Sequence, residues 1–174
     1  MQLFFEILKY TVPALIVFFT AYFLLKQLLD ERQRIDRAIL RQDAQKITLP
    51  LRLQAYERLI LLCDRVAIHN TLLRIRMPGM TVGELTGALL LSISQEFEHN
   101  TSQQLFVSET LWRIISVARE QTLSLVTQAS EGLDSKADAQ LLVDKLFAAL
   151  DEQGMPTSLN RAIMAIRMEA GQLF

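Results

Sequence analysis

The sequence predicts an all-α protein with one N-terminal transmembrane helix that continues into a charged stalk, followed by a cytoplasmic bundle of four to five helices. Three observations predict this fold. The chain of 174 residues contains only 6 Gly and 4 Pro, so few positions interrupt a helix. Apolar residues make up 51% of the chain and recur mainly at helical spacing. A long apolar run without charges stands close to the N-terminus.

This apolar run, YTVPALIVFFTAYFLL, extends from Tyr10 to Leu25 and is bracketed by Lys9 and Lys26. Roughly 20 apolar residues span a membrane, and the apolar flanks and the reach of the two lysines extend this run. The segment lacks the positive cluster and small-residue cleavage site of a signal peptide. It is also too apolar on all sides for a helix of a small bundle. We therefore expect a permanent anchor over residues 1–29, carried by Tyr10, Pro13, Phe18, Phe19, Phe23, Leu25 and Lys26.

The basic residues beside this run predict its orientation. On the C-terminal side, Lys26 is followed by four arginines within residues 32–41, whereas Lys9 stands alone on the N-terminal side. The positive-inside rule then predicts a single-pass protein of the bacterial inner membrane, with the N-terminus outside and the C-terminal domain in the cytoplasm. A lone cysteine, Cys63, is compatible with a reducing compartment and excludes an internal disulfide.

Residues 30–49 are expected to form a charged helical stalk. Leu28, Ile35 and Ile39 form a thin apolar stripe that Arg32 interrupts, which is typical of a solvated helix or of one strand of a short coiled coil. We regard these three apolar residues as possible interface positions. Pro50, after the alternating residues 47–49, predicts an extended break before the domain of residues 50–174.

Helix-start and helix-stop signals divide the domain. Residues 51–67 have helical spacing and place Cys63 on an apolar face as a buried thiol. Residues 71–77 are either a short extended piece or a final helical turn. After a turn at residues 77–80, Thr81 and Glu84 form a capping box that opens a helix through residue 98, and Gly83 and Gly87 would let another helix approach closely.

Three more helices are expected after residue 100. Thr101 and Gln104 form a second capping box, which predicts a helix over residues 102–131 that ends at Gly132. A further helix is expected to begin at Ser135 and to end near Gly154, and a last one begins near residue 158.

Net charge is −1, but the charges are unevenly spread. Basic residues outnumber acidic ones by 11 to 6 over residues 26–76, and acidic residues outnumber basic ones by 12 to 6 from residue 84 onward. The basic half could contact anionic lipids beside a bilayer. Alternatively, the two halves complement each other within one bundle or between subunits.

The chain has two histidines, and each begins the tripeptide His-Asn-Thr, at residues 69–71 and 99–101. Both copies fall where one apolar-periodic segment stops and another begins. Asn can adopt the left-handed conformation that ends a helix, and His suits the negative end of the helix dipole. We therefore interpret both copies as helix punctuation.

Glu96 and His99 are the strongest candidates for chemistry. Their Glu-x-x-His spacing places both side chains on one helix face, and di-metal bundles use two such motifs with two further glutamates. The motif occurs once here, so only a homo-oligomer could assemble a metal-binding or hydrolytic site from Glu96, Glu98 and His99. This is the alternative function that the sequence leaves open.

Other catalytic and binding classes find no support. The sequence contains no nucleophile motif, phosphate loop or zinc-protease motif, so we expect no enzyme and no cofactor. Acidic residues are interleaved among the arginines, which disfavours nucleic acid as a partner. Trp112 is expected to pack in the core or at an interface.

Three segments, LRLQAYERLILLCDR, LLRIRMPGMT and SISQEFEHNTSQQLFVSETLW, resemble a family of small single-span membrane proteins from Bacteroidetes whose function is unknown. The resemblance covers the chain from the apolar run to about Glu131. It implies an inner-membrane anchor with a cytoplasmic helical domain, and it implies no catalytic or binding residues.

These observations together predict a membrane-anchored scaffold or interaction protein. Its expected partners are the lipid bilayer and either a second copy of the chain or another protein.

Overall fold

The computed structural model describes residues 2–154 and 157–173, with the side chains of these residues except those of residues 2–14, 17, 36–44 and 153. Over this part the chain is helical and contains no strand, apart from an isolated bridge between Thr81 and Asp138. The helices are α1 (Gln2–Arg65), α2 (Ile68–Ile75), α3 (Val82–Asn100), the 3-10 helix η1 (Thr101–Phe106), α4 (Glu109–Ser130), α5 (Gln140–Gln153) and α6 (Ser158–Gly171). The helical architecture agrees with the sequence prediction, whereas its transmembrane part does not.

The chain divides into two compact units, Met1–Thr48 and Leu49–Phe174. The first unit is the N-terminal part of α1. Within it, every side chain that the structure describes, over residues 15–35 and 45–48, is exposed. The second unit holds the end of α1 and all the other helices.

The predicted transmembrane anchor is wrong. Among the residues that the structure describes, no helix has both the length and the apolar character needed to cross a membrane. The prediction of a single-pass protein of the inner membrane, which depended on this anchor, is therefore wrong as well. The same holds for the predicted orientation, with the N-terminus outside and the domain in the cytoplasm.

Of the seven residues expected to carry the anchor, five have side chains that the structure describes. The side chains of Tyr10 and Pro13 lie outside those that the structure describes. The remaining five are exposed in the first unit: Phe18, Phe19, Phe23, Leu25 and Lys26.

The break expected at Pro50 is also wrong, because α1 continues through this residue to Arg65. A proline inside a helix removes one backbone hydrogen bond and costs roughly 3 kcal/mol. The buried face that follows offsets this cost. Ala55, Tyr56, Leu59 and Leu62 are each no more than 3% exposed and join the core of the second unit.

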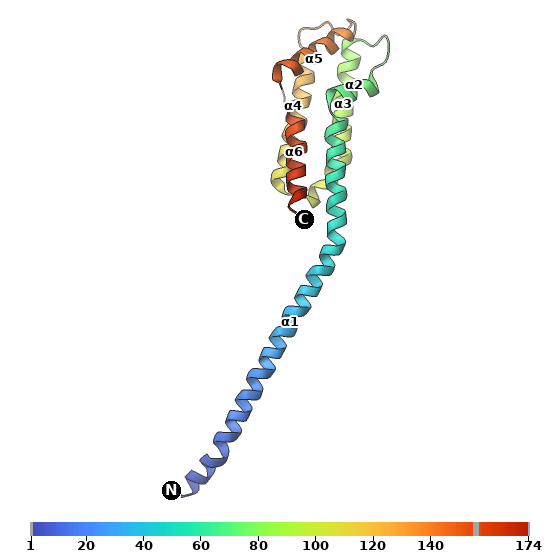
Figure 1. Ribbon diagram of the computed structural model, residues 1–174. Coiled ribbons are helices and arrows are strands. Elements are labelled where there is room, and N and C mark those ends of the chain that lie inside the picture. Colours follow the sequence, from blue (N-terminus) through green and yellow to red (C-terminus); the bar gives the residue numbers. More distant parts are fainter. Residues whose placement is uncertain (1, 155–156, 174) are drawn as a thin grey trace. The chain divides into compact units, whose positions relative to one another are not determined.

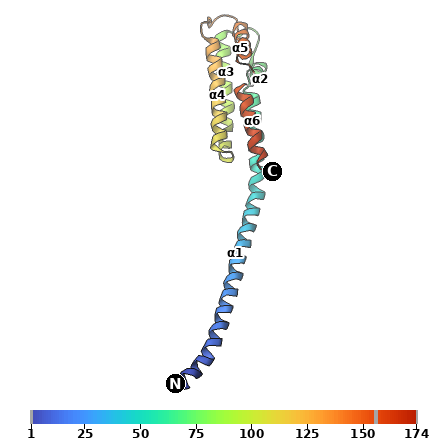
Figure 2. The same cartoon turned by 60° about the vertical axis from the view of Figure 1, so that its left-hand side comes forward.

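Within the second unit, α4 lies antiparallel to both α3 and α6, and α2 packs on α3 (Figures 1 and 2). The core between these helices holds Leu111, Ile115 and Ala118 of α4, all at most 2% exposed. Ile114 of the same helix is 36% exposed. Cys63 is buried as predicted, and burial raises the pKa of its thiol to about 12.

Several of the predicted signals for helix starts and helix ends are confirmed. Thr81 and Glu84 form both hydrogen bonds of the capping box at the start of α3. Gly132 and Gly154 have φ angles of +74° and +65° and follow α4 and α5, as expected of glycines that end helices. The open question at residues 71–77 is answered by α2, which ends at Ile75 before an extended Arg76.

The second predicted capping box does not form, and the helix expected over residues 102–131 is two elements. Thr101 begins η1, and Ser108 caps α4 by accepting a hydrogen bond from the Leu111 backbone N–H at 3.1 Å. The hydroxyl of Thr101 instead donates to the carbonyl of Phe97 at 3.1 Å. Thr101 also has helical backbone angles, φ −57° and ψ −33°, whereas a residue that caps the start of a helix has an extended backbone.

Helix α5 begins at Gln140 rather than at Ser135, because the loop before it caps another helix. The first amides of α3, on Val82 and Gly83, donate to the carbonyls of Ala137 and Ser135, each at 2.9 Å. A Cβ atom at Gly83 would lie 3.2 Å from that Ser135 oxygen. The close approach expected at Gly83 is therefore made by this loop, and Gly87 faces open space.

Candidate functional site

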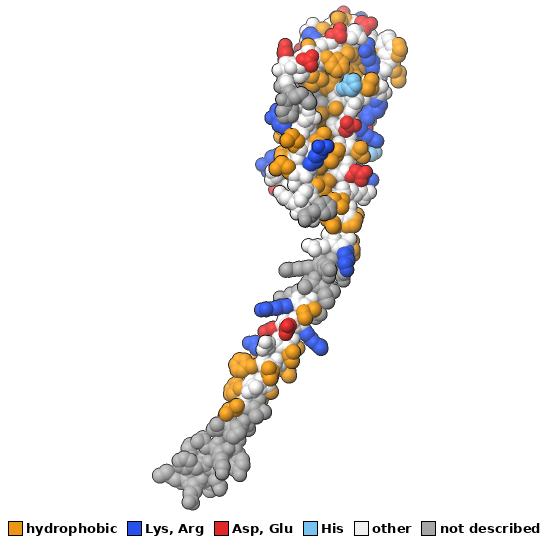
Figure 3. Space-filling view, viewed as in Figure 1, with side chains coloured by type: hydrophobic (Ala, Val, Ile, Leu, Met, Phe, Trp, Pro, Cys, Tyr) orange, Lys and Arg blue, Asp and Glu red, His pale blue; other side chains and the backbone are white. Residues whose placement is uncertain are grey.

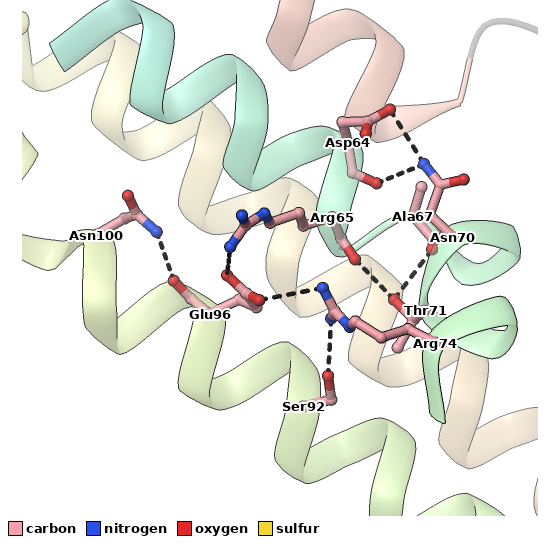
Figure 4. A network of polar contacts seen from close by, with 9 residues as sticks. All are labelled: Asp64, Arg65, Ala67, Asn70, Thr71, Arg74, Ser92, Glu96 and Asn100. Atoms are coloured by element: carbon pink, nitrogen blue, oxygen red, sulfur yellow. Dashed lines mark hydrogen bonds and ion pairs between the residues drawn. The ribbon is translucent and has the colours of Figure 1, made fainter. Parts of the chain in front are cut away.

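The first His-Asn-Thr copy caps the end of α1 with its side chains (Figure 4). The Asn70 amide donates to the carbonyl and carboxylate oxygens of Asp64 at 2.9 and 3.0 Å. The buried Thr71 hydroxyl lies 2.9 Å from the carbonyl of Arg65 and 3.0 Å from that of Ala67. These donors satisfy carbonyls that a helix end leaves without partners.

The second copy does the same for α3. The Asn100 amide donates to the carbonyl of Glu96 at 2.8 Å, beside the Thr101 bond to Phe97. Helix punctuation is therefore the role of both copies, but its mechanism differs from the prediction. Neither Asn is left-handed, because no described residue other than glycine has a positive φ. His99 lies in the last turn of α3 as expected, whereas His69 lies at the start of α2 with its ring 6.2 Å from that of Phe147.

Glu96 ties three helices together. One carboxylate oxygen lies 3.5 Å from Arg65 on α1, and the other lies 3.2 Å from Arg74 on α2. Arg74 also donates to the hydroxyl of Ser92 at 3.0 Å, one turn before Glu96 on α3 (Figure 4). The Glu96 side chain is 19% exposed, so these contacts are partly shielded from water.

The surroundings of Glu96 do not fit a metal site. It lines a groove of about 850 Å³ with Glu98 and His99, but Arg58, Arg65 and Arg74 line the same groove. Guanidinium groups occupy both carboxylate oxygens and repel a cation. Over the part of the chain that the structure describes, no three His, Cys, Asp or Glu side chains gather as a metal would need. Glu96 acts here as a clamp between helices.

A second polar cluster, centred on Glu169 of α6, was missed by sequence reasoning. Its carboxylate accepts hydrogen bonds from the Ser108 backbone N–H at 2.8 Å, from the Ser108 hydroxyl and from the Tyr56 hydroxyl at 3.0 Å. Arg52 donates to the same Tyr56 hydroxyl at 2.9 Å and lies 3.9 Å from Glu169. The partners are 61 and 113 residues away in sequence, so no local pattern signals the cluster.

The cluster shifts two pKa values. Burial alone would raise the pKa of Glu169, but the hydrogen bonds from Ser108 and Tyr56 and the charge of Arg52 outweigh it and lower that pKa. Burial, followed by the hydrogen bond to Glu169, raises the pKa of Tyr56, so its hydroxyl stays a donor. The cluster thus joins α1, the start of α4 and α6.

The residues predicted for an interface differ in accessibility. Leu28 is 61% and Ile35 is 52% exposed in the first unit, while the side chain of Ile39 lies outside those described. Trp112 is half-buried, with its ring 5.2 Å from that of Phe97. Trp112 therefore packs against the core.

The comparisons with known proteins place the chain in a family. The family described as a family of unknown function, DUF7935, matches residues 2–173, and the chain belongs to it. No curated protein and no solved structure matches. The sequence motifs predicted membership in a family of unknown function, and this part of the prediction is confirmed.

Proposed function

We propose that this chain, as a member of a family with no assigned function, is a non-enzymatic helical scaffold that self-associates through the first part of α1. The observation that carries the proposal is the exposure of several large apolar side chains on one helix. Leu25 and Leu28 are 62% and 61% exposed, and Phe18 and Phe23 are 63% and 64% exposed. From the sequence motifs, we also propose that the family is one found in Bacteroidetes.

Spacing supports a second helix as the cover for these side chains. Leu25, Leu28 and Ile35 follow one another at intervals of three and seven residues, as the seam of a coiled coil requires. Arg32 interrupts this seam and limits its stability. Hydrophobic side chains extend along this part of α1 (Figure 3). A row of this kind, exposed to water, favours association.

The expected energy is large enough to measure. Burying one leucine side chain fully is worth about 1.5–3 kcal/mol, and a pair of helices holds two copies of each leucine. Removing Leu25 and Leu28 therefore takes four leucines from the seam. Half of the full burial energy of these four leucines is about 3–6 kcal/mol. Its loss raises the dissociation constant of the oligomer more than about 100-fold.

Native mass spectrometry and chemical crosslinking of the full chain, without detergent, test the proposal. The wild type is expected to form an oligomer that the double variant Leu25→Ser/Leu28→Ser loses. Gln27→Ser/Arg34→Ser is the matched control, because it lowers helix propensity similarly but lies off the seam. A monomeric wild type, or equal loss of the oligomer in both double variants, would contradict self-association through this face.

A further inference from the structure

A groove between α4 and α6 is a second candidate interaction surface, and it lies wholly within the second unit. It consists of two cavities, of about 600 Å³ and about 300 Å³. Thr110 and Ile114 line both cavities, so the two cavities adjoin each other, and we refer to them together as the groove. Val117 lines the smaller cavity, and Ala165 and Met168 line the larger one.

The apolar side chains of this groove are well exposed. Val117 is 49% and Met168 is 70% exposed, and Ile114 is 36% exposed. Methionine adapts its shape to irregular partners, and contiguous apolar rows over two helices are typical of interaction sites.

The dimensions fit one helix. The lining residues of α4 extend from Thr110 to Gln121, which corresponds to about 17 Å, or roughly three helical turns. A helix laid in such a groove presents apolar residues at positions i, i+3, i+4 and i+7. The groove is open to solvent along this length, so a partner segment can reach it directly.

The charges around the groove select the partner. Arg113 and Arg161 line the smaller cavity, and no acidic residue is among the described residues that line it. Glu169 is the acidic residue lining the larger cavity, and its carboxylate is engaged by Ser108 and Tyr56. Arg113 pairs with Glu109, but both side chains are more than 70% exposed, so this ion pair is weak and can be exchanged.

We propose that this groove binds an acidic amphipathic helix of a partner protein. The apolar face of that helix packs on Ile114, Val117 and Met168, and carboxylates along its edge pair with Arg113 and Arg161. The surface is distinct from the first part of α1, so it provides a docking site beyond self-association.

The test is fluorescence anisotropy with the full chain and a labelled amphipathic peptide of about 18 residues, long enough to form a helix. Its apolar positions are leucine and its edges are glutamate, and the reference peptide carries lysine in place of every glutamate. The glutamate peptide is expected to bind at least about tenfold more tightly than the lysine peptide. Its affinity should fall as salt rises from about 50 to about 300 mM, because exposed charges are screened.

Two variants locate the binding. Arg161→Glu and Val117→Ser are each expected to weaken binding of the glutamate peptide at least about tenfold. Arg167→Glu makes the same charge change on the same helix outside the groove lining, and should change binding less than about threefold. Circular dichroism confirms folding, and because Val117 is exposed its substitution should leave the fold intact.

Three results would overturn the proposal. Equal binding of the two peptides would remove the charge preference. Equal effects of Arg161→Glu and Arg167→Glu would show that the peptide does not bind in the groove. Loss of the wild-type oligomer in Val117→Ser, measured by light scattering, would assign the groove to a second copy of this chain.

Discussion

The substitution Glu169→Ala tests whether the cluster between α1, α4 and α6 stabilises the domain. The carboxylate accepts three hydrogen bonds, two from Ser108 and one from Tyr56, and its side chain is 16% exposed. Alanine removes all three and also leaves Arg52 without this ion pair. We expect the free energy of unfolding of the second unit to fall.

The structure sets the size of this loss. A hydrogen bond contributes about 1 kcal/mol net, and more when one partner is charged. Ser108 is exposed, so water replaces part of what it loses, and the total is expected to be about 2–3 kcal/mol. For a domain of this size that corresponds to a decrease in Tm of roughly 6–10 °C. Glu169→Gln keeps an acceptor oxygen and should cost about 1 kcal/mol.

The loss should depend on pH. The pKa of Glu169 is lower in the folded than in the unfolded chain, so its carboxylate stabilises the fold above the unfolded value, near 4.3. This stabilisation disappears as pH falls through the lower folded pKa. The difference between wild type and Glu169→Gln should therefore be largest at neutral pH and shrink in acid.

Urea denaturation followed by circular dichroism, at pH 7 and at several values below pH 5, measures both effects. Glu109→Ala is the matched control, because Glu109 begins α4 but is 87% exposed, and should change stability by less than about 0.5 kcal/mol. If Glu169→Ala is no more destabilising than Glu109→Ala, the cluster does not hold α6 in place. A pH-independent difference would contradict the role of the carboxylate charge.

Three further predictions concern the buried and clamped groups of the second unit. Glu96→Ala should lower the stability of the second unit by about 1–2 kcal/mol in thermal melts, because two arginines lose their partner. Metal analysis should show no change, and an unchanged Tm would contradict the role of Glu96 as a clamp. Cys63, 1% exposed and with a pKa of about 12, should react with a thiol reagent only at the rate of unfolding, and fast labelling of native protein would contradict its burial. Thr71→Val should cost about 1–2 kcal/mol in urea denaturation, because it removes a fully buried hydroxyl that caps α1, and an unchanged midpoint would contradict that cap.

Local patterns were sufficient for much of the fold. The helical class, the buried face around Cys63 and the capping box at Thr81 depend on residues a few positions apart. The stop signals Gly132 and Gly154 are equally local, because a positive φ favours glycine wherever the rest of the chain lies. These features follow from backbone geometry and side-chain period, and the structure agrees with them.

Other local patterns were misleading, and only one of them was overridden by a tertiary contact. Thr101 has the spacing of a helix cap, yet its hydroxyl bonds back to α3. Ser135 has the position of a helix start, yet its carbonyl caps α3 instead. The apolar run before Lys26 predicted a membrane anchor, and no helix in the described part of the chain meets that requirement.

The sequence by itself determined that this protein is helical, where its core faces lie and where several helices end, because these depend on residues a few positions apart along the chain. Only the tertiary structure decided what its polar residues do. It placed Glu96 between two arginines of other helices and Glu169 beside partners 61 and 113 residues away. It also set Arg113 and Arg161 beside one groove. Such pairings depend on which helices pack together, and that choice is made by the core as a whole.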